Sequence, residues 1–293
     1  MKIFGIEVEV KKTLCSLNGK APVKITEPYV NVYVRMTNHC NANCAFCDFK
    51  NNACKKNFDF YKFYYMLIEL RKQVKINKIS FTGGEPTLCI NTMVKCLELV
   101  RIVDKTIFTV VNTNGFNLEY LDKPEYLNLI DSICLSRHEI KDLEVYLAFN
   151  CVIKTSKDLN EMSKEMKKKI HLSCNLIKGR IDGFVKAHDF IDFYSGLGFH
   201  DFGFVSLMPV NQFCKDNFID FDQAELWKMK NTIKTKDFAY GTGCKCNNFL
   251  TTSDKGVINK VYARYYCDHT RSDSTLVYDI DCLKIGFQGA ILL

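Results

Sequence analysis

Six short apolar runs, each ending in turn residues, alternate along the chain with longer segments of helical period. The strand-like runs cover residues 29–36, 76–84, 105–115, 130–138, 168–179 and 199–210. The helix-like segments cover residues 57–74, 91–103, 118–129, 155–167, 183–196 and 220–234. Strands that alternate with helices form parallel sheets through right-handed crossovers. Because six such units are fewer than the eight of a closed barrel, the pattern predicts a barrel-like or open wound α/β sheet.

The two flanking segments differ from this alternating pattern. Residues 1–28 precede the first long strand, and residues 236–293 hold glycines, turn residues and alternating apolar runs without a long helical period. The sequence therefore predicts an N-terminal β-rich lead-in over 1–28, a barrel over 29–235 and a small β-rich C-terminal extension over 236–293.

Composition limits the class of protein. The 293 residues include 15 cysteines, but neither the apolar run of a signal peptide nor one long enough to span a membrane. We therefore expect a cytoplasmic protein with reduced thiols and no membrane partner. The net charge of +7 is scattered, and the densest basic run, 164–171, is typical of a solvated helix end. Nucleic acid is not expected as a partner, whereas an anionic substrate is compatible with this charge.

Three cysteines lie within eight positions directly after the first predicted strand, in "MTNHCNANCAFCDF" (36–49). They are Cys40, Cys44 and Cys47. Clustered thiolates select zinc, copper(I) or iron–sulfur clusters. Structural zinc takes four ligands, usually in two pairs, and only His39 or Cys54 could be offered here as a fourth. A cubane iron–sulfur cluster held by three cysteines would leave one iron open for chemistry.

Other cysteines stand singly in apolar segments, where a free thiol behaves as a small hydrophobic side chain. The expected core fillers are Cys89, Cys96, Cys134, Cys151 and Cys174.

A second motif, "TGGEPTL" (82–88), follows the second predicted strand. The two glycines, Gly83 and Gly84, let the backbone approach a ligand closely, and Glu85 offers an acceptor for an ammonium group. A bare turn with a solvated glutamate is the alternative interpretation. Because the carboxyl ends of parallel strands meet at one edge of a barrel, we expect this motif and the three cysteines to share one rim.

The spacing Cys-x3-Cys-x-Phe-Cys after the first strand, with Gly-Gly-Glu after the second, resembles the signature of the radical S-adenosylmethionine (radical SAM) superfamily. The resemblance covers roughly residues 29–210 and implies an α/β fold, a partial (β/α)6 TIM-like barrel with a small β-rich C-terminal extension. It also implies a 4Fe–4S cluster on Cys40, Cys44 and Cys47, with SAM chelating the fourth iron. In that family the cluster reductively cleaves SAM to a 5′-deoxyadenosyl radical that abstracts hydrogen from substrate.

The same resemblance implies which residues of this chain bind SAM. They are Phe46, Gly83, Gly84, Glu85, Asn114, Ser136, Arg137, Asn175 and Met208. Strand-end polarity or core packing is the competing interpretation for Asn114, Asn175 and Met208. The sequence does not identify a catalytic residue beyond these cofactor contacts.

Further cysteines lie in the C-terminal segment. Cys244, Cys246 and Cys267 are expected as ligands of an auxiliary 4Fe–4S cluster, with Cys282 or substrate as the fourth ligand. The segment resembles the SPASM or twitch modules of many radical SAM enzymes in position and glycine content, although its Cys-x-Cys start departs from their spacing. A structural zinc site, or no metal at all, is the alternative.

The resemblance predicts a radical SAM enzyme that acts on a small-molecule or short peptide substrate and receives electrons from a donor such as flavodoxin or ferredoxin. One alternative is a maturase of a ribosomally made peptide that uses an auxiliary cluster. An alternative from a different class is a zinc-stabilised, non-catalytic binding protein. The identity of the substrate and the outcome of hydrogen abstraction cannot be read from these residues.

Overall fold

The computed structural model of the chain describes residues 1–8, 28–47, 57–151, 153–229, 232, 247–264, 275–286 and 291–293. The strands are β1 (Lys2–Ile3), β2 (Ile6–Glu7), β3 (Tyr29–Arg35), β4 (Lys75–Thr82), β5 (Phe108–Thr113), β6 (Ser132–Ser136), β7 (Ile170–Leu176), β8 (Asp201–Ser206), β9 (Asn247–Thr252), β10 (Ile258–Arg264), β11 (Thr275–Asp279) and β12 (Cys282–Ile285).

Nine α-helices lie in the described part of the chain. They are α1 (Phe60–Gln73), α2 (Ile90–Val103), α3 (Pro124–Leu127), α4 (Asp142–Phe149), α5 (Ser156–Glu161), α6 (Lys164–Lys169), α7 (Phe184–Gly196), α8 (Gln212–Asp216) and α9 (Phe221–Ala224). Three 3-10 helices, η1 (Pro86–Cys89), η2 (Leu118–Leu121) and η3 (Leu226–Lys228), lie between them.

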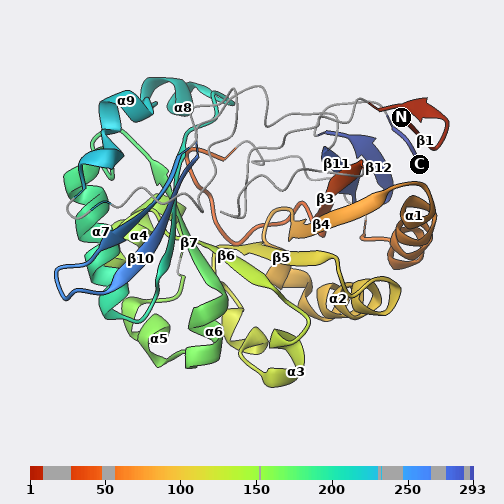
Figure 1. The fold of residues 1–293 in the computed structure, drawn as a ribbon, viewed down its shortest axis with the longest axis horizontal. Coiled ribbons are helices and arrows are strands. Elements are labelled where there is room, and N and C mark those ends of the chain that lie inside the picture. Colours follow the sequence, from red (N-terminus) through yellow and green to blue (C-terminus); the bar gives the residue numbers. More distant parts are fainter. Residues whose placement is uncertain are drawn as a thin grey trace.

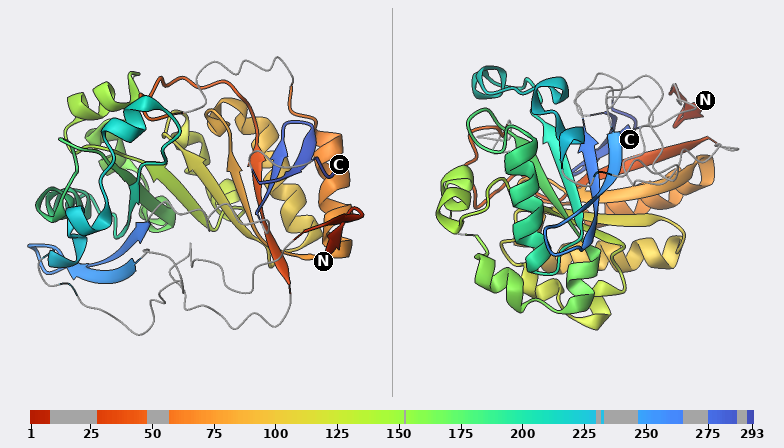
Figure 2. Two further views of the ribbon diagram at one scale, coloured as in Figure 1. Left: turned by 90° about the horizontal axis from the view of Figure 1, so that it is seen from above. Right: turned by 60° about the vertical axis from the view of Figure 1, so that its left-hand side comes forward.

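One large curved sheet organises the fold, and the α/β fold class is confirmed. Its ten strands follow the order β12-β11-β3-β4-β5-β6-β7-β8-β10-β9. The six predicted parallel strands are β3 to β8, in sequence order. Figures 1 and 2 show the helices from α1 to α7 gathered along one face of this sheet.

The C-terminal strands extend the sheet at both ends. Strand β10 pairs in parallel with β8, and β11 pairs in parallel with β3. The antiparallel strands β9 and β12 complete the two edges. Within the described residues the sheet therefore has eight parallel strands, where the alternation along the chain predicted six. The three-part division of the chain at residues 28 and 235 stays a prediction.

Several predicted helices are shorter than their hydrophobic period suggested. The segment 118–129 forms η2 and α3, because Pro124 has no backbone N–H to donate and holds the preceding Lys123 in an extended conformation. The segment 155–167 divides into α5 and α6, and Ser163 caps the second helix by accepting from the Met166 amide. Helices α4 and α8 were not predicted, and both contact the candidate site.

Strand alternation separates an apolar outer face of the sheet from a polar inner face. On β6, Ile133 and Leu135 are buried under the helices, whereas Cys134 and Ser136 point to the inner side and are only half-buried. Strand β7 repeats this alternation. The main hydrophobic core therefore lies between the sheet and the helices, and the inner face is left for polar side chains.

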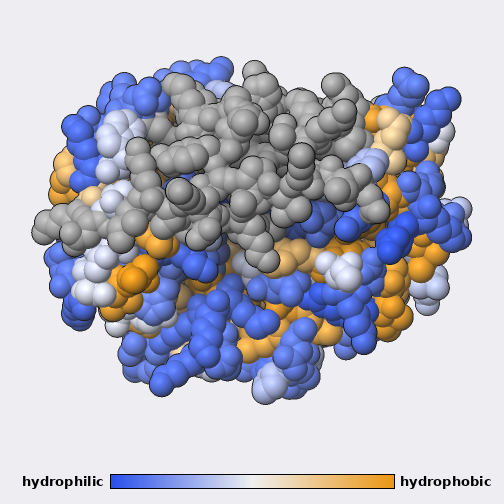
Figure 3. All heavy atoms as spheres, in the orientation of Figure 1, coloured by the Kyte–Doolittle hydropathy of each residue, from blue (hydrophilic) through white to orange (hydrophobic). Residues whose placement is uncertain are grey.

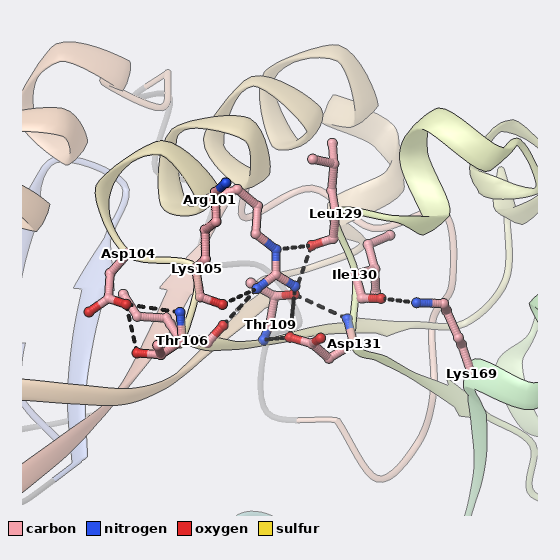
Figure 4. A network of polar contacts seen from close by, with 10 residues as sticks. Arg101, Asp104, Lys105, Thr106, Thr109, Leu129, Ile130, Asp131 and Lys169 are labelled. Atoms are coloured by element: carbon pink, nitrogen blue, oxygen red, sulfur yellow. Dashed lines mark hydrogen bonds and ion pairs between the residues drawn. The ribbon is translucent and has the colours of Figure 1, made fainter.

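Arg101 of α2 ties this helix to the start of two strands (Figure 4). Its guanidinium donates to the carbonyls of Ile107 (2.9 Å) and Leu129 (3.1 Å), to Thr109 Oγ1 (2.8 Å) and to the Asp131 carboxylate (2.7 Å). One side chain thus satisfies backbone and carboxylate oxygens before β5 and β6, which fixes α2 against the sheet.

Hydrophilic and hydrophobic residues are interspersed on the visible surface, with apolar areas broken by charged ones (Figure 3). None of the described helices combines the length and apolar character that crossing a membrane requires.

Replacing Arg101 tests the importance of this network. R101M is expected to lower the free energy of unfolding by about 2 kcal/mol, because hydrogen bonds to charged groups contribute roughly 1.5–3 kcal/mol. Arg71 serves as the control, since its ion pair with Asp104 (2.6 Å) is at the surface, and R71M should cost under about 1 kcal/mol. Urea unfolding measures both values. Equal losses of unfolding free energy in the two variants would show that the Arg101 network stabilises the fold no more than a surface ion pair does.

Candidate active site

The loop after β3 is held against the loop after β4 by backbone contacts. We call residues 36–47 the cysteine loop. The Gly84 amide donates to the Thr37 carbonyl (2.7 Å), and the Glu85 amide donates to the His39 carbonyl (2.8 Å). A Cβ atom on Gly84 would lie 2.0 Å from the His39 oxygen, and one on Gly83 would lie 2.4 Å from the Thr37 oxygen. Both glycines are therefore required for contact with the cysteine loop itself.

Glu85 is a buried carboxylate that joins two loops of the rim, the edge of the sheet formed by the carboxyl ends of the strands. It is 1% exposed. Its Oε1 accepts from the Thr87 amide (3.0 Å), Thr87 Oγ1 (2.7 Å) and Thr113 Oγ1 (2.7 Å), and its Oε2 accepts from the Asn114 amide (2.7 Å). These protein donors occupy most of its acceptor capacity. The predicted contact between Glu85 and the SAM ammonium stays a prediction.

Asn114 connects the β5 loop to the cysteine loop. Its Nδ2 donates to Asn41 Oδ1 (2.8 Å) and lies 3.9 Å from Cys40 Sγ. Its Oδ1 accepts from the Phe116 amide (3.0 Å). The structure therefore brings Asn114 to the first predicted cluster ligand, as expected for a residue of the rim.

The three cysteines of the loop differ in exposure. Cys40 is exposed, Cys47 is half-buried and Cys44 is buried. The Cys47 amide donates to the Cys44 carbonyl (3.2 Å), which folds the loop into a tight turn. Within the described ranges, no three Cys, His, Asp or Glu side chains are placed to hold one metal ion. A tetrahedral zinc site needs such convergence, whereas in a cubane cluster each thiolate binds its own iron.

The environment of the cysteine loop raises the pKa of two of its thiols, those of Cys40 and Cys44. Burial is the largest cause for Cys44, whose pKa rises to about 12, and the neighbouring thiols of Cys47, Cys40 and Cys151 contribute further. Burial also raises the pKa of Cys40. Thiolate ligands must lose their protons, so binding of a cluster here would be coupled to proton release.

Cys151 was expected in the core, but the structure places it beside the cysteine loop. Asn41 Nδ2 lies 3.7 Å from Cys151 Sγ, and Cys151 packs against the cluster formed by Cys44, Val145 and Phe149. Its single position in the sequence gave no signal of this neighbourhood. Cys96 and Cys174 are buried in the core as expected, whereas Cys89 and Cys134 are only half-buried and the prediction for them is wrong.

Helices α4 and α8, which the sequence did not predict, and apolar side chains beside them pack against the cysteine loop. The Asn43 amide donates to the Phe149 carbonyl at the end of α4 (2.8 Å). Asn211, which caps α8, donates to the Ala45 carbonyl (3.1 Å), and Cys214 Sγ donates to the Phe46 carbonyl (3.4 Å). The loop is therefore fixed by contacts from segments far apart in the sequence.

Phe46 packs on a buried histidine. Its ring meets that of His138 edge-on at 4.7 Å between centroids, and His138 stacks on Phe149 at 4.9 Å. The Asn175 amide donates to His138 Nδ1 (3.0 Å), so the ring proton resides on Nε2. Burial, with Arg137 and Arg180 nearby, lowers the pKa of His138 to about 3. A neutral imidazole therefore supports Phe46.

The remaining predicted SAM contacts separate into inner and outer positions. Ser136 ends β6 and Asn175 is the penultimate residue of β7, both on the inner side of the sheet, and Met208 follows β8 with 39% of its surface exposed. The guanidinium of Arg137 points to the helix layer instead. It donates to Tyr194 Oη (2.9 Å), the Lys154 carbonyl (2.6 Å) and the Asp142 carboxylate (3.2 Å).

Of the four C-terminal cysteines, Cys282 is the one that lies within the described residues. It begins β12, and its Sγ donates to the Asp279 carbonyl (3.8 Å). Cys244, Cys246 and Cys267, like Cys54, lie outside the described residues. The auxiliary site therefore stays a prediction.

Comparisons with known proteins identify the family of this chain. The Radical SAM superfamily matches residues 34–180. A probable GTP 3′,8-cyclase of Thermococcus kodakarensis is 29% identical over 175 residues, which cover 58% of this chain and 55% of that protein. A Methanocaldococcus jannaschii protein that carries the name of a glycyl-radical enzyme activating enzyme is 34% identical over 91 residues, or 31% of this chain and 34% of the relative. The chain thus spans about half the length of the first relative and a third of the second.

Solved structures show a weaker likeness. Streptococcus suis SuiB, solved with its precursor peptide SuiA, has a TM-score of 0.49 and 14% identity, with 64% of this chain and 41% of that chain covered. The family match is the stronger finding, since it covers half of the chain and contains both the cysteine loop and Gly83–Glu85. On this basis the protein belongs to the radical SAM superfamily, whose enzymes bind a 4Fe–4S cluster and SAM.

Proposed function

We propose that this enzyme binds its 4Fe–4S cluster through Cys40, Cys44 and Cys47 and binds SAM along the adjoining rim, to act on a small-molecule or short peptide substrate. The observation that carries this proposal is the close docking of the cysteine loop onto Gly83–Glu85. The donor set fits the cluster, because three soft thiols of one loop lie beside a rim of polar groups. When bound, the cluster and SAM supply a carbon radical that removes hydrogen from substrate.

The chain's own residues hold and orient the reactants. Ser136 and Asn175 face the inner side of the sheet, where we propose that they donate to polar groups of SAM. Phe46 and Met208 offer apolar surface near the loop for the adenine. We propose that Glu85 and Arg137 act by positioning, since their charged groups already bind other parts of the chain. Such fixed placement is what radical chemistry at one C–H bond requires.

We propose an electron donor of the flavodoxin or ferredoxin kind as partner. Cys40 is the exposed cysteine of the loop, so electrons would enter on its side. The zinc-stabilised, non-catalytic binding protein considered as an alternative does not fit a member of this enzyme superfamily.

A second candidate function is maturation of a ribosomally made peptide with the help of an auxiliary cluster. The sequence feature that favours it is the group Cys244, Cys246 and Cys267, with Cys282 or substrate as the fourth ligand. Two cysteines one residue apart in a glycine-bearing segment are more typical of metal or cluster ligands than of a packed core.

The cluster ligands can be tested by single substitutions. Cys40→Ala, Cys44→Ala and Cys47→Ala should each abolish production of 5′-deoxyadenosine from SAM, because each removes one iron ligand. Circular dichroism should show that each variant stays folded. Cys96→Ala, in the core, is the matched control and should keep both iron and SAM cleavage. Normal 5′-deoxyadenosine production in any of the three loop variants would refute the ligand assignment.

Glu85→Gln tests the junction between the two loops. The amide NH2 would face a hydrogen-bond donor, either the Asn114 amide or the Thr87 and Thr113 groups. We expect a loss of about 1–3 kcal/mol in the free energy of unfolding and weaker SAM binding at unchanged iron content. Glu119→Gln, at an exposed ion pair with Lys154, is the control and should change neither. Unaltered stability and SAM affinity in Glu85→Gln would contradict the proposed role of Glu85 at this junction.

The auxiliary cluster is tested in a variant that cannot bind the SAM-cleaving cluster. The variant that lacks Cys40, Cys44 and Cys47 should still hold about four irons per chain after anaerobic reconstitution. Further replacement of Cys244, Cys246 and Cys267 is the control and should remove this iron. A triple variant loaded with zinc, or free of both metals, would rule out the auxiliary cluster and its use in peptide maturation.

A further inference from the structure

The inner face of the sheet lines an open cavity of about 310 Å³. Side chains from β3 to β8 and from β10 line it. Asn112 and Val205 lie one residue before the ends of β5 and β8, so the cavity reaches to within about 3 Å of the rim, at about 3.3 Å per residue. Its size suits a small-molecule ligand or part of a larger one.

The charged side chains around this cavity are mainly basic. Lys78, Lys168, Lys169 and Arg264 line it, against the two carboxylates Asp131 and Asp201. Figure 4 shows that Asp131 is already held by Arg101 and Thr109, and that Lys169 donates to the Ile130 carbonyl. Asp201 pairs with His171. The two acidic groups therefore have protein partners, and so do Lys169 and Lys168, the latter through an ion pair with Glu165 (2.7 Å).

Lys78 differs from the other basic residues of the cavity. It is only 6% exposed, and its Nζ lies 5.8 Å from the centre of the Tyr33 ring. In the part of the chain that the structure describes, its ammonium has neither a hydrogen bond nor a carboxylate partner. Burial lowers its pKa to about 8, with Arg264 contributing, so most of it is still charged at pH 7. Burying a charge without an opposite charge beside it is unfavourable, and a bound anion would offset this cost.

We propose that this cavity binds the negatively charged end of the enzyme's substrate, a carboxylate or phosphate group, with Lys78 as its counter-charge. The inference rests on the proposed function, because the rest of the substrate would extend from Lys78 to the rim. Lys78 stands four residues before Thr82 at the end of β4, a span of about 13 Å. The substrate is therefore an anion long enough to place a C–H bond at the rim while its charged end stays deep.

The binding of simple anions to the full chain tests this assignment. Isothermal titration calorimetry is performed under anaerobic conditions at constant ionic strength, with inorganic pyrophosphate and succinate as separate probes. The wild type should bind at least one probe saturably, and the probe that binds tells phosphate from carboxylate. K78M should bind it at least tenfold more weakly, whereas Lys78→Arg should restore binding because it keeps the charge. K95M removes an exposed lysine of α2 and should bind like the wild type.

Equal binding by the wild type and K78M, or no saturable binding of either probe to the wild type, would overturn the assignment. If K78M does not fold by circular dichroism, Lys78→Gln takes its place. SAM cleavage by the wild type is measured separately. Anion binding through Lys78 without 5′-deoxyadenosine production would refute the proposed function alone. Production of 5′-deoxyadenosine without anion binding through Lys78 would refute only the cavity assignment.

Discussion

The contact between the backbone at residues 37–39 and the turn at Gly83–Glu85 is the constraint on which the site depends. Two amide–carbonyl hydrogen bonds and two positions without a Cβ atom bring adjacent strand ends into direct contact. The buried carboxylate of Glu85 then binds the loop after β5 through Thr113 and Asn114. Three consecutive strand ends are thereby fixed to one another, and the cysteines are positioned from this base.

The cysteine loop combines rigidity with chemistry that requires deprotonation. Phe46 of the loop packs edge-on against His138, which stacks on Phe149, and His138 is neutral, so it adds no charge beside the thiols. The same burial raises the pKa of Cys44. A thiol with a raised pKa must lose its proton to bind a metal, so metal binding at this loop would be accompanied by proton release.

The two faces of the sheet use charged residues differently. On the helix side, the guanidinium groups of Arg101 and Arg137 donate to carbonyls and carboxylates, and these hydrogen bonds join helices to strands. On the inner side, Lys78 has no such partner among the described residues. The paired charges of the outer face stabilise the fold, whereas we propose that Lys78 on the inner face pairs with a bound anion.

The sequence by itself determined the six parallel strands β3 to β8, because the alternation of strand and helix periods is a local property. It also placed the cysteines and Gly83–Glu85 at one rim, since parallel strands carry their carboxyl ends to the same edge. Only the tertiary structure decided that β10 and β11 extend both ends of the sheet, because that pairing joins segments far apart in the chain. It alone brought Cys151 to the cysteine loop and left Lys78 buried with no carboxylate partner among the described residues, since both depend on which neighbours the fold supplies.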